Sequence, residues 1–194
     1  MKLIFASHND NKTREIRELL PSYDLQSLKD LNYHQEIPET GETLAENAEI
    51  KARTIFNAFG TAVFADDTGL IVPALNGAPG VYSARYAGPE ANADANMSKL
   101  LADLASAGSR EAYFETLICY IDPAGKSHFF SGKVEGEILL ERKGGAGFGY
   151  DPIFKPTGYD LSFAEMSSAA KNAISHRGRA LQSFIHHLAQ AEKS

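Results

Sequence analysis

The chain alternates short apolar segments with longer amphipathic ones, and this alternation limits the folds open to it. Residues 2–6 are apolar enough for a buried strand, and residues 11–20 carry Ile and Leu at helical spacing. A second strand is expected at 25–28, a helix at 42–59 and a third strand at 61–65. Strands that alternate with helices in this way predict an α/β fold.

The second half of the chain predicts a mixed rather than a wholly parallel sheet. Residues 113–121 are apolar on both faces, as in the centre of a sheet. Residues 122–125, Asp-Pro-Ala-Gly, suit a type I turn, so residues 128–140 are expected to return antiparallel as a hairpin. A helix is expected at 91–107, before the hairpin. No repeat or linker-like stretch divides residues 1–194, so we expect a single domain.

Charge and cysteine content exclude several classes of protein. The chain has 19 Lys and Arg against 25 Asp and Glu, a formal net charge of −6, so a broad basic face for nucleic acid or anionic lipid is not expected. The single cysteine, Cys119, excludes an internal disulfide framework and a thiolate zinc site. No apolar run approaches the ~18 residues of a membrane helix, and the first residues resemble a strand rather than a targeting segment. These features predict a cytoplasmic protein in which any anionic ligand is held by a local positive pocket.

Lys12 lies where a helix normally avoids a positive charge. It stands in the first turn of the helix expected at 11–20, and its spacing to Ile16 turns it toward the inner side. A cation there is unfavourable with the helix dipole by ~0.3–1 kcal/mol unless an anion binds the N–H groups of that turn. Ser7 and Asn9 offer a hydroxyl and an amide to the same anion, although either would also serve as an ordinary helix cap. The loop therefore indicates a phosphate cradle, although it lacks the glycines of a Walker motif.

A second lysine, Lys51, falls on the flank of the apolar arc of the helix at 42–59, one turn after Asn47. It is therefore expected at the edge of a buried surface. A lysine whose stem crosses the core while its ammonium group reaches bulk water is an equal alternative from this helix alone.

Two adjacent carboxylates, Asp66 and Asp67, follow the strand expected at 61–65. Open α/β sheets bind ligands beyond the carboxyl ends of their strands, and carboxylates placed there usually hold a divalent cation. We expect Asp66 to cap a turn and Asp67 to bind the metal. Glu39, in a loop before a helix, is the second candidate ligand, although a simple contact with the helix N-terminus would also explain it.

A third group of cations, Lys171, His176 and Arg177, lies at or near the expected start of the final helix. The Gly-rich loop at 144–151 does not match a dinucleotide fingerprint. Its glycines instead favour close approach of the backbone to a flat ligand that stacks on Phe148.

Seven short motifs, taken together and in order, resemble those of the inosine/xanthosine triphosphate pyrophosphatases. They are Ser7-x-Asn9-x-x-Lys12, Glu39-Thr40-Gly41, Glu46-Asn47-Ala48 with Lys51-Ala52-Arg53, Ala65-Asp66-Asp67-Thr68-Gly69-Leu70, Gly77-Ala78-Pro79-Gly80 with Ser83-Ala84-Arg85-Tyr86, Gly147-Phe148-Gly149-Tyr150-Asp151-Pro152 and Ser175-His176-Arg177. The match spans nearly the whole chain. The resemblance implies an elongated mixed β-sheet with two α/β lobes around a central active-site cleft, and a homodimer. It also implies Mg²⁺-dependent hydrolysis of dITP, ITP and XTP to the monophosphate and pyrophosphate.

The resemblance further implies a role for each candidate residue. Lys12 and Lys51 would hold the triphosphate, Glu39 and Asp67 would hold Mg²⁺ directly or through water, and Asp67 would also orient or deprotonate the attacking water. Phe148 would stack on the purine, with donors aimed at a 6-oxo group. The implied substrate-binding set is Ser7, His8, Asn9, Asp10, Asn11, Lys12, Thr68, Phe148, Gly149, Tyr150, Asp151, Lys171, His176 and Arg177.

Two other enzymatic or binding functions stay open at this point. A nucleotide sensor that does not hydrolyse its ligand would use the same cations but would have little need for Asp67 and Glu39 around a metal. A pyrophosphatase for modified pyrimidine nucleotides would need a smaller base pocket. A purely structural or partner-binding protein leaves the inward-facing Lys12 and Lys51 unexplained.

Overall fold

The computed structural model describes residues 2–191, and within them the chain forms two compact units. The first unit combines three separate stretches of chain, residues 2–67, 116–132 and 178–191. The second contains residues 68–115 and 133–177. Each unit is described by itself below.

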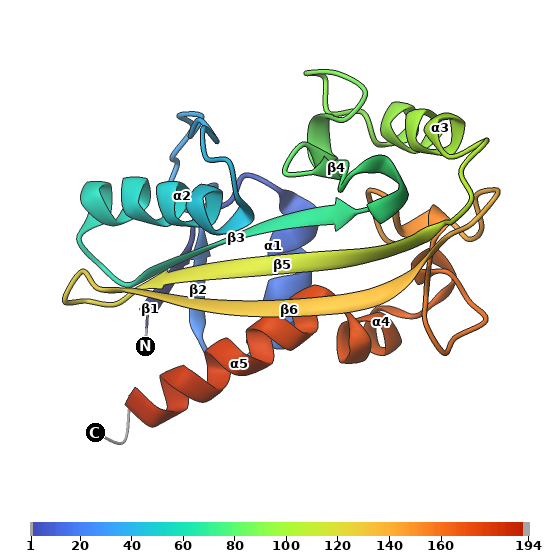
Figure 1. The fold of residues 1–194 in the computed structure, drawn as a ribbon. Helices are drawn as coiled ribbons and strands as arrows, with labels where there is room; N and C mark the ends of the chain where they lie inside the picture. Colours follow the sequence, from blue (N-terminus) through green and yellow to red (C-terminus); the bar gives the residue numbers. More distant parts are fainter. Residues whose placement is uncertain (1, 192–194) are drawn as a thin grey trace. The chain divides into compact units, whose positions relative to one another are not determined.

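The strands form a mixed sheet, as the hairpin and the alternating elements predicted. Their order is β2-β1-β3-β5-β6-β7, and β4 pairs with β3. Strand β1 is parallel to both β2 and β3, whereas the pairs β3–β4 and β6–β7 are antiparallel. The strands are β1 Lys2–Phe5, β2 Asp24–Ser27, β3 Val63–Ile71, β4 Pro79–Gly80, β5 Glu111–Ile121, β6 Ser127–Ile138 and β7 Phe154–Pro156 (Figure 1).

Five α-helices lie within the described residues. They are α1 Asp10–Leu19, α2 Leu44–Phe59, α3 Ala93–Asp103, α4 Ser168–Ile174 and α5 His176–Ala191. Helix α3 is shorter at both ends than the expected 91–107, because Asn92 caps it and the last turn closes at Leu104. None of the helices in residues 2–191 is long and apolar enough to cross a membrane.

Local signals explain why α2, the helix that carries Lys51, begins and ends where it does. Thr43 and Glu46 form a reciprocal capping box at its start. At its end Gly60 adopts φ 62°, the left-handed conformation that glycine accepts without steric cost. The predicted stop at Gly60 is confirmed.

The first unit packs helices on both faces of its strands, because successive side chains of a strand point to opposite faces. Phe5 and Phe64 pack with α1 and α5 on one face, while their neighbours Ile4 and Val63 pack with α2 on the other. Figure 1 shows α2 and α5 on opposite sides of these strands. Cys119 lies in the core on the α2 side, and burial raises the pKa of its thiol to about 12.

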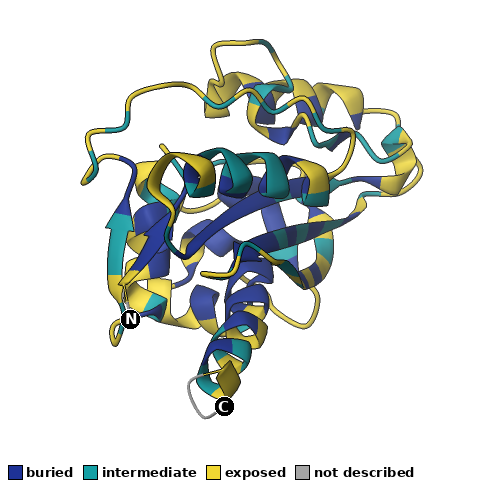
Figure 2. Cartoon of the chain, turned by 90° about the vertical axis from the view of Figure 1, so that its left-hand side faces the viewer, coloured by how far each residue is buried: buried dark blue, intermediate teal, exposed yellow. Residues whose placement is uncertain are grey.

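The second unit has its own core, centred on Phe114 of β5. The Phe114 ring centroid lies 4.7 Å from that of Phe154 and 6.2 Å from that of Phe163, and Leu100 of α3 packs in the same cluster. Figure 2 shows the same division in both units, with buried residues in the strands and exposed ones in the connecting loops. Because each core is complete in itself, each unit presents its functional side chains from a separate scaffold.

Phe64→Ala is expected to lower the free energy of unfolding by about 3–5 kcal/mol, because it opens a cavity in the first core. The Phe64 ring is fully buried, with its centroid 4.9 Å from Phe5 and 5.0 Å from Phe184. Urea unfolding followed by circular dichroism measures the loss. Phe59→Ala is the matched control, since that ring is 39% exposed and its removal should cost less than about 1 kcal/mol. Equal losses would contradict this assignment of the core.

Candidate functional site

Asp66 and Asp67 lie in the middle of β3 rather than at its end, so the predicted strand boundary is wrong. Strand β1 pairs with β3 at Ile4↔Val63 and Phe5↔Phe64, and β1 ends at Phe5. The two aspartates therefore lie along β3 just beyond the carboxyl end of its parallel neighbour β1. The general rule that ligands bind beyond the carboxyl ends of parallel strands applies here to β1 and not to β3.

Lys12 and Asp66 form a buried ion pair. Lys12 Nζ donates to Asp66 Oδ1 at 3.1 Å, and the Asp66 side chain is fully buried. The expectation that Asp66 caps a turn is wrong, because it compensates the charge of the inward-facing lysine instead. The predicted orientation of Lys12 is confirmed, with its side chain only 14% exposed.

Lys51 lies between two carboxylates. Its Nζ donates to Glu39 Oε1 at 2.5 Å and lies 3.6 Å from Asp67 Oδ1, and its side chain is 11% exposed. The alternative in which the ammonium group reaches bulk water is therefore wrong. Glu39 likewise bonds to Lys51, so a simple contact with the start of α2 does not explain it.

Burial and neighbouring charges act in opposite directions on the pKa values of Lys51 and Asp67. Burial alone would lower the pKa of Lys51, but the surrounding Asp67, Glu39 and Asp66 outweigh it and raise the pKa. For Asp67 burial dominates, and its pKa is raised despite the attraction of Lys51 and Lys12. Lys51 therefore keeps its positive charge, and Asp67 accepts a proton more readily than an ordinary aspartate.

The loop before α1 is organised by its own polar side chains. Ser7 Oγ accepts from Asn9 N at 3.1 Å, and Asn9 Oδ1 accepts from Lys12 N at 3.0 Å as the N-cap of α1. The capping alternative is confirmed for Asn9. Contact of this loop with phosphate stays a prediction. The other members of the implied set make local contacts: His8 Nε2 with Gln35 O, Asp10 with Lys29, and Asn11 with Arg14.

The cluster of Glu39, Asp66 and Asp67 with two lysines has a donor set that suits Mg²⁺. No group of three or more His, Cys, Asp or Glu side chains within residues 2–191 is arranged to enclose a metal ion. Mg²⁺ is usually bound by one or two carboxylates, with substrate phosphates and water completing its shell. Glu39 and Asp67 are two carboxylates that face one point, so they fit a metal that arrives with a phosphate ligand.

The second unit gathers the predicted base-recognition residues around Phe148. Lys171 Nζ lies 4.9 Å and Arg177 Cζ 5.6 Å from the centroid of the Phe148 ring. Arg177 also donates from Nη2 to Thr68 Oγ1 at 3.3 Å, and the His176 ring stacks on Phe114 at 4.6 Å. The structure therefore brings together four residues that are far apart in sequence: Thr68, Phe148, Lys171 and Arg177.

Asp151 holds this group in place. Its Oδ2 accepts from Phe148 N and from Lys171 Nζ, both at 2.8 Å, and the Asp151 and Lys171 side chains are each 5% exposed. Lys171 lies in the last turn of α4, a short helix that ends directly before α5, so its charge is favourable with the dipole of α4. Tyr150 is anchored separately, since its OH donates to Ser83 O and burial raises its pKa. Gly149, which lies between Phe148 and Tyr150 in the chain, adopts φ 63°.

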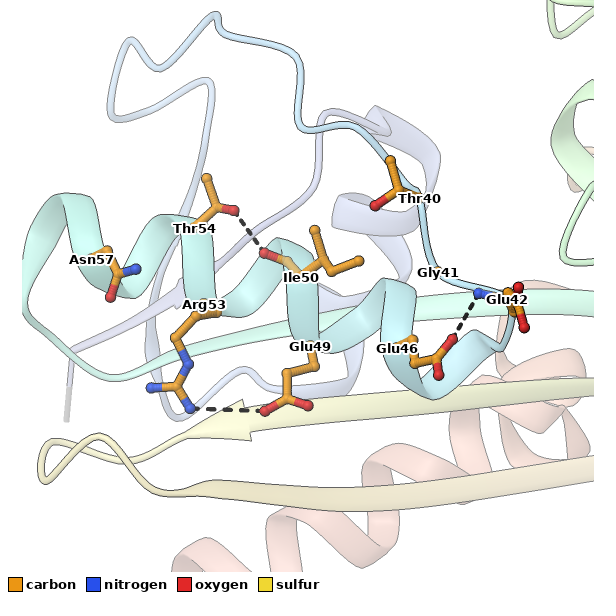
Figure 3. Close-up of a pocket in the computed structure, with 9 residues that line it drawn as sticks. All are labelled: Thr40, Gly41, Glu42, Glu46, Glu49, Ile50, Arg53, Thr54 and Asn57. Atoms are coloured by element: carbon orange, nitrogen blue, oxygen red, sulfur yellow. Dashed lines mark hydrogen bonds and ion pairs between the residues drawn. The ribbon is translucent and has the colours of Figure 1, made fainter.

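A groove of about 570 Å³ lies along α2 and the segment that leads into it (Figure 3). Glu49 in its wall pairs with Arg53 at 3.8 Å, and Glu46 belongs to the capping box. Glu49 and Arg53 also bond to Ser127 at the start of β6, so these two charged side chains link α2 to the hairpin. The lining residues are Thr40, Gly41, Glu42, Glu46, Glu49, Ile50, Arg53, Thr54 and Asn57.

Sequence reasoning missed two residues of the cluster. The role of Asp66 as the partner of Lys12 was signalled by the excess of inward-facing charge, since each buried lysine requires a buried acid. Asn47 was noted only for its position, yet it is fully buried beside the Glu39 loop. The sequence signal that could have identified Asn47 was an amide side chain one helical turn before an inward-facing lysine.

The fold and the two residue groups define a mixed α/β protein with an acid–lysine cluster in one unit and a cationic aromatic site in the other. Residues 3–187 match the Ham1 family, and the chain belongs to that family.

Similar proteins cover nearly the whole chain. A protein of Christiangramia forsetii named dITP/XTP pyrophosphatase is 52% identical over 191 residues, which are 98% of this chain and 100% of that protein. A protein of the same name from Flavobacterium johnsoniae is 50% identical over 95% of this chain and 96% of its own length. The structure of the Staphylococcus aureus Ham1 protein superposes with a TM-score of 0.89 at 38% identity, over 98% of this chain and 100% of that one.

Asp151→Ala is expected to lower the free energy of unfolding by about 3–5 kcal/mol, because it leaves the ammonium group of Lys171 buried without its carboxylate. Chemical denaturation measures this loss. Glu135→Ala is the control, because its ion pair with Lys133 is exposed and should contribute less than about 1 kcal/mol. If both substitutions cost the same small amount, Asp151 does not anchor the site.

Proposed function

We propose that this protein hydrolyses non-standard purine nucleoside triphosphates (dITP, ITP and XTP) to the monophosphate and pyrophosphate, with Mg²⁺ as cofactor. The observation that carries the proposal is the position of Lys51, held between Glu39 and Asp67 beyond the end of β1. The relatives named dITP/XTP pyrophosphatase support it. A nucleotide sensor would not need this pair of carboxylates.

The chemistry assigned to the first unit is attack of water on the α-phosphorus. Glu39 and Asp67 would hold Mg²⁺, which supplies charge stabilisation on the phosphate oxygens when bound. Lys12 and Lys51 bind the triphosphate and stabilise the negative charge that develops on the leaving group. Asp67, with its raised pKa, orients the water and accepts its proton as the new oxygen–phosphorus bond forms and the bond to pyrophosphate breaks.

The second unit is assigned to the base. Phe148 stacks on the purine, and Arg177, His176 and Lys171 offer donors toward a 6-oxo group. The contacts of Lys171 and Arg177 with the Phe148 ring support this assignment. Asp151 acts by fixing the Phe148 backbone and Lys171.

The proposal includes a homodimer in the cytoplasm, where nucleoside triphosphates are used. The resemblance to the inosine/xanthosine triphosphate pyrophosphatases supports the homodimer, and the single cysteine, Cys119, fits the reducing conditions of the cytoplasm. Light scattering on the purified protein measures the oligomeric state.

Steady-state release of pyrophosphate from ITP, XTP, ATP, GTP and dUTP, with and without Mg²⁺, tests the proposed function. We expect release from ITP and XTP that stops on chelation of the metal and returns with added Mg²⁺. Binding without release would identify a nucleotide sensor. Preference for dUTP would identify a pyrophosphatase for pyrimidine nucleotides.

Asp67→Asn is expected to lower kcat by at least ~10²-fold with the fold retained, because the change is nearly isosteric but removes a metal ligand and a proton acceptor. Initial rates at limiting Mg²⁺ and neutral pH measure the effect. Asp160→Asn, at an exposed position, controls for loss of one negative charge. Near-normal hydrolysis by the Asp67 variant would remove that residue from the mechanism.

Arg177→Ala is expected to lower kcat/KM for ITP while leaving the poor activity on ATP almost unchanged. A guanidinium group only donates, so it suits the O6 acceptor of hypoxanthine and leaves the amino group of adenine facing another donor. An unsatisfied buried group costs ~1–3 kcal/mol, so we expect the wild-type protein to prefer ITP over ATP by ~10²-fold. Equal kcat/KM values for ITP and ATP in the wild-type protein would refute this account of selectivity.

A further inference from the structure

The segment that carries Glu39 is tied to α2 at two points. Glu39 itself bonds to Lys51. Two residues later, the backbone N–H of Gly41 donates to Asn47 Oδ1 at 2.8 Å. Asn47 lies one helical turn before Lys51, so both attachments use the same side of the helix.

At the second attachment the backbone of Gly41 packs too closely against α2 to leave space for a side chain. A Cβ on Gly41 would lie 2.6 Å from Glu46 Cβ and 2.8 Å from Asn47 Oδ1, closer than carbon and oxygen atoms approach in proteins. Beside it, Glu42 N donates to Glu46 Oε2 at 2.7 Å, as Figure 3 shows. The path of the chain after Glu39 is therefore fixed by contact with the first turn of α2.

An asparagine at position 47 would destabilise the fold if its side chain only filled space. Its side chain is fully buried, and within residues 2–191 its Nδ2 has no hydrogen-bond partner. A leucine of similar volume would pack without that unsatisfied donor. The one polar interaction recorded for the Asn47 side chain is the acceptance of the Gly41 N–H. The benefit of the amide at this position lies in that bond.

We propose that Asn47 is a positioning residue that holds Glu39 ready to bind the metal, by fixing the backbone two residues downstream. The inference rests on the proposed function and deepens it. Without the Gly41 bond, the segment that carries Glu39 would lose its backbone attachment to the buried face of α2. The metal would then have to order the segment on binding, and its affinity would fall.

A double-substitution cycle tests the inference through metal affinity rather than through activity. Binding of Mn²⁺ as a probe is measured by electron paramagnetic resonance, in the presence of an ITP analogue that cannot be hydrolysed between the α- and β-phosphates. Asn47→Ala should weaken Mn²⁺ binding by about tenfold. In the Glu39→Gln background the same substitution should weaken it by less than about twofold, because the group that Asn47 positions is already impaired. Asn57→Ala, at an exposed position of α2, should have no effect on binding.

A second variant approaches the contact from the loop, in case Asn47→Ala does not fold. Gly41→Ala forces the segment away from Asn47 and should weaken Mn²⁺ binding to a similar extent. Gly108→Ala is its control, since nothing lies within 4 Å of a Cβ there. Recovery of hydrolysis by Asn47→Ala at high Mg²⁺ would further support the proposal.

Three results would overturn the inference. The first is that Asn47→Ala lowers Mn²⁺ affinity equally in the wild-type and Glu39→Gln backgrounds. The others are that Asn47→Ala lowers the melting temperature but leaves Mn²⁺ affinity unchanged, or that the wild-type protein does not bind Mn²⁺. Failure of the proposed function is a separate result. It would appear as Mn²⁺ and analogue binding by the wild-type protein with no release of pyrophosphate, and the cycle would still decide the role of Asn47.

Discussion

The site depends on compensation among buried charges beyond the end of β1. Lys12 is paired with Asp66, and Lys51 with Glu39 and Asp67, in positions that water scarcely reaches. The cluster has three carboxylates and two ammonium groups, and Lys51 is shared between Glu39 and Asp67, so removal of Lys51 leaves two carboxylates without their common cation. In the proposed reaction this arrangement couples metal and phosphate. Glu39 and Asp67 would hold the metal, and Lys51, which lies between them, would bind the triphosphate.

Two separate hydrophobic cores give the charged side chains rigid supports. In the first unit α1 and α2 cover opposite faces of the strands, so Lys12 and Lys51 approach the aspartates of β3 from two helices. In the second unit, Asp151 ties the Gly-rich loop to Lys171 of α4. Buried ion pairs thus fix loop segments that have no regular secondary structure of their own.

Much of the fold and part of the site follow from local sequence patterns. The mixed sheet, the stop of α2 at Gly60 and the inward orientation of both lysines were predicted correctly, because each depends on spacing within a few residues. The sequence predicted that the strand ends before Asp66, because aspartate and glycine are rare inside strands. That boundary was wrong. There the burial of two aspartates against lysines 15 or more residues away outweighs that preference. The start of the final helix at His176 agrees with the prediction, but the separate short helix α4 that carries Lys171 was not predicted.

The presence of two independent cores bears on how such a protein changes over evolutionary time. Phe148, Lys171 and Asp151 rest on one core, while Lys12, Lys51 and Glu39 rest on the other. In the proposed function, substitutions that alter the choice of base therefore fall in the unit that does not carry Lys12, Lys51 and Glu39. A lineage can acquire a new nucleotide preference by drift in one unit while the hydrolytic apparatus in the other stays intact, and selection can act on the two properties separately.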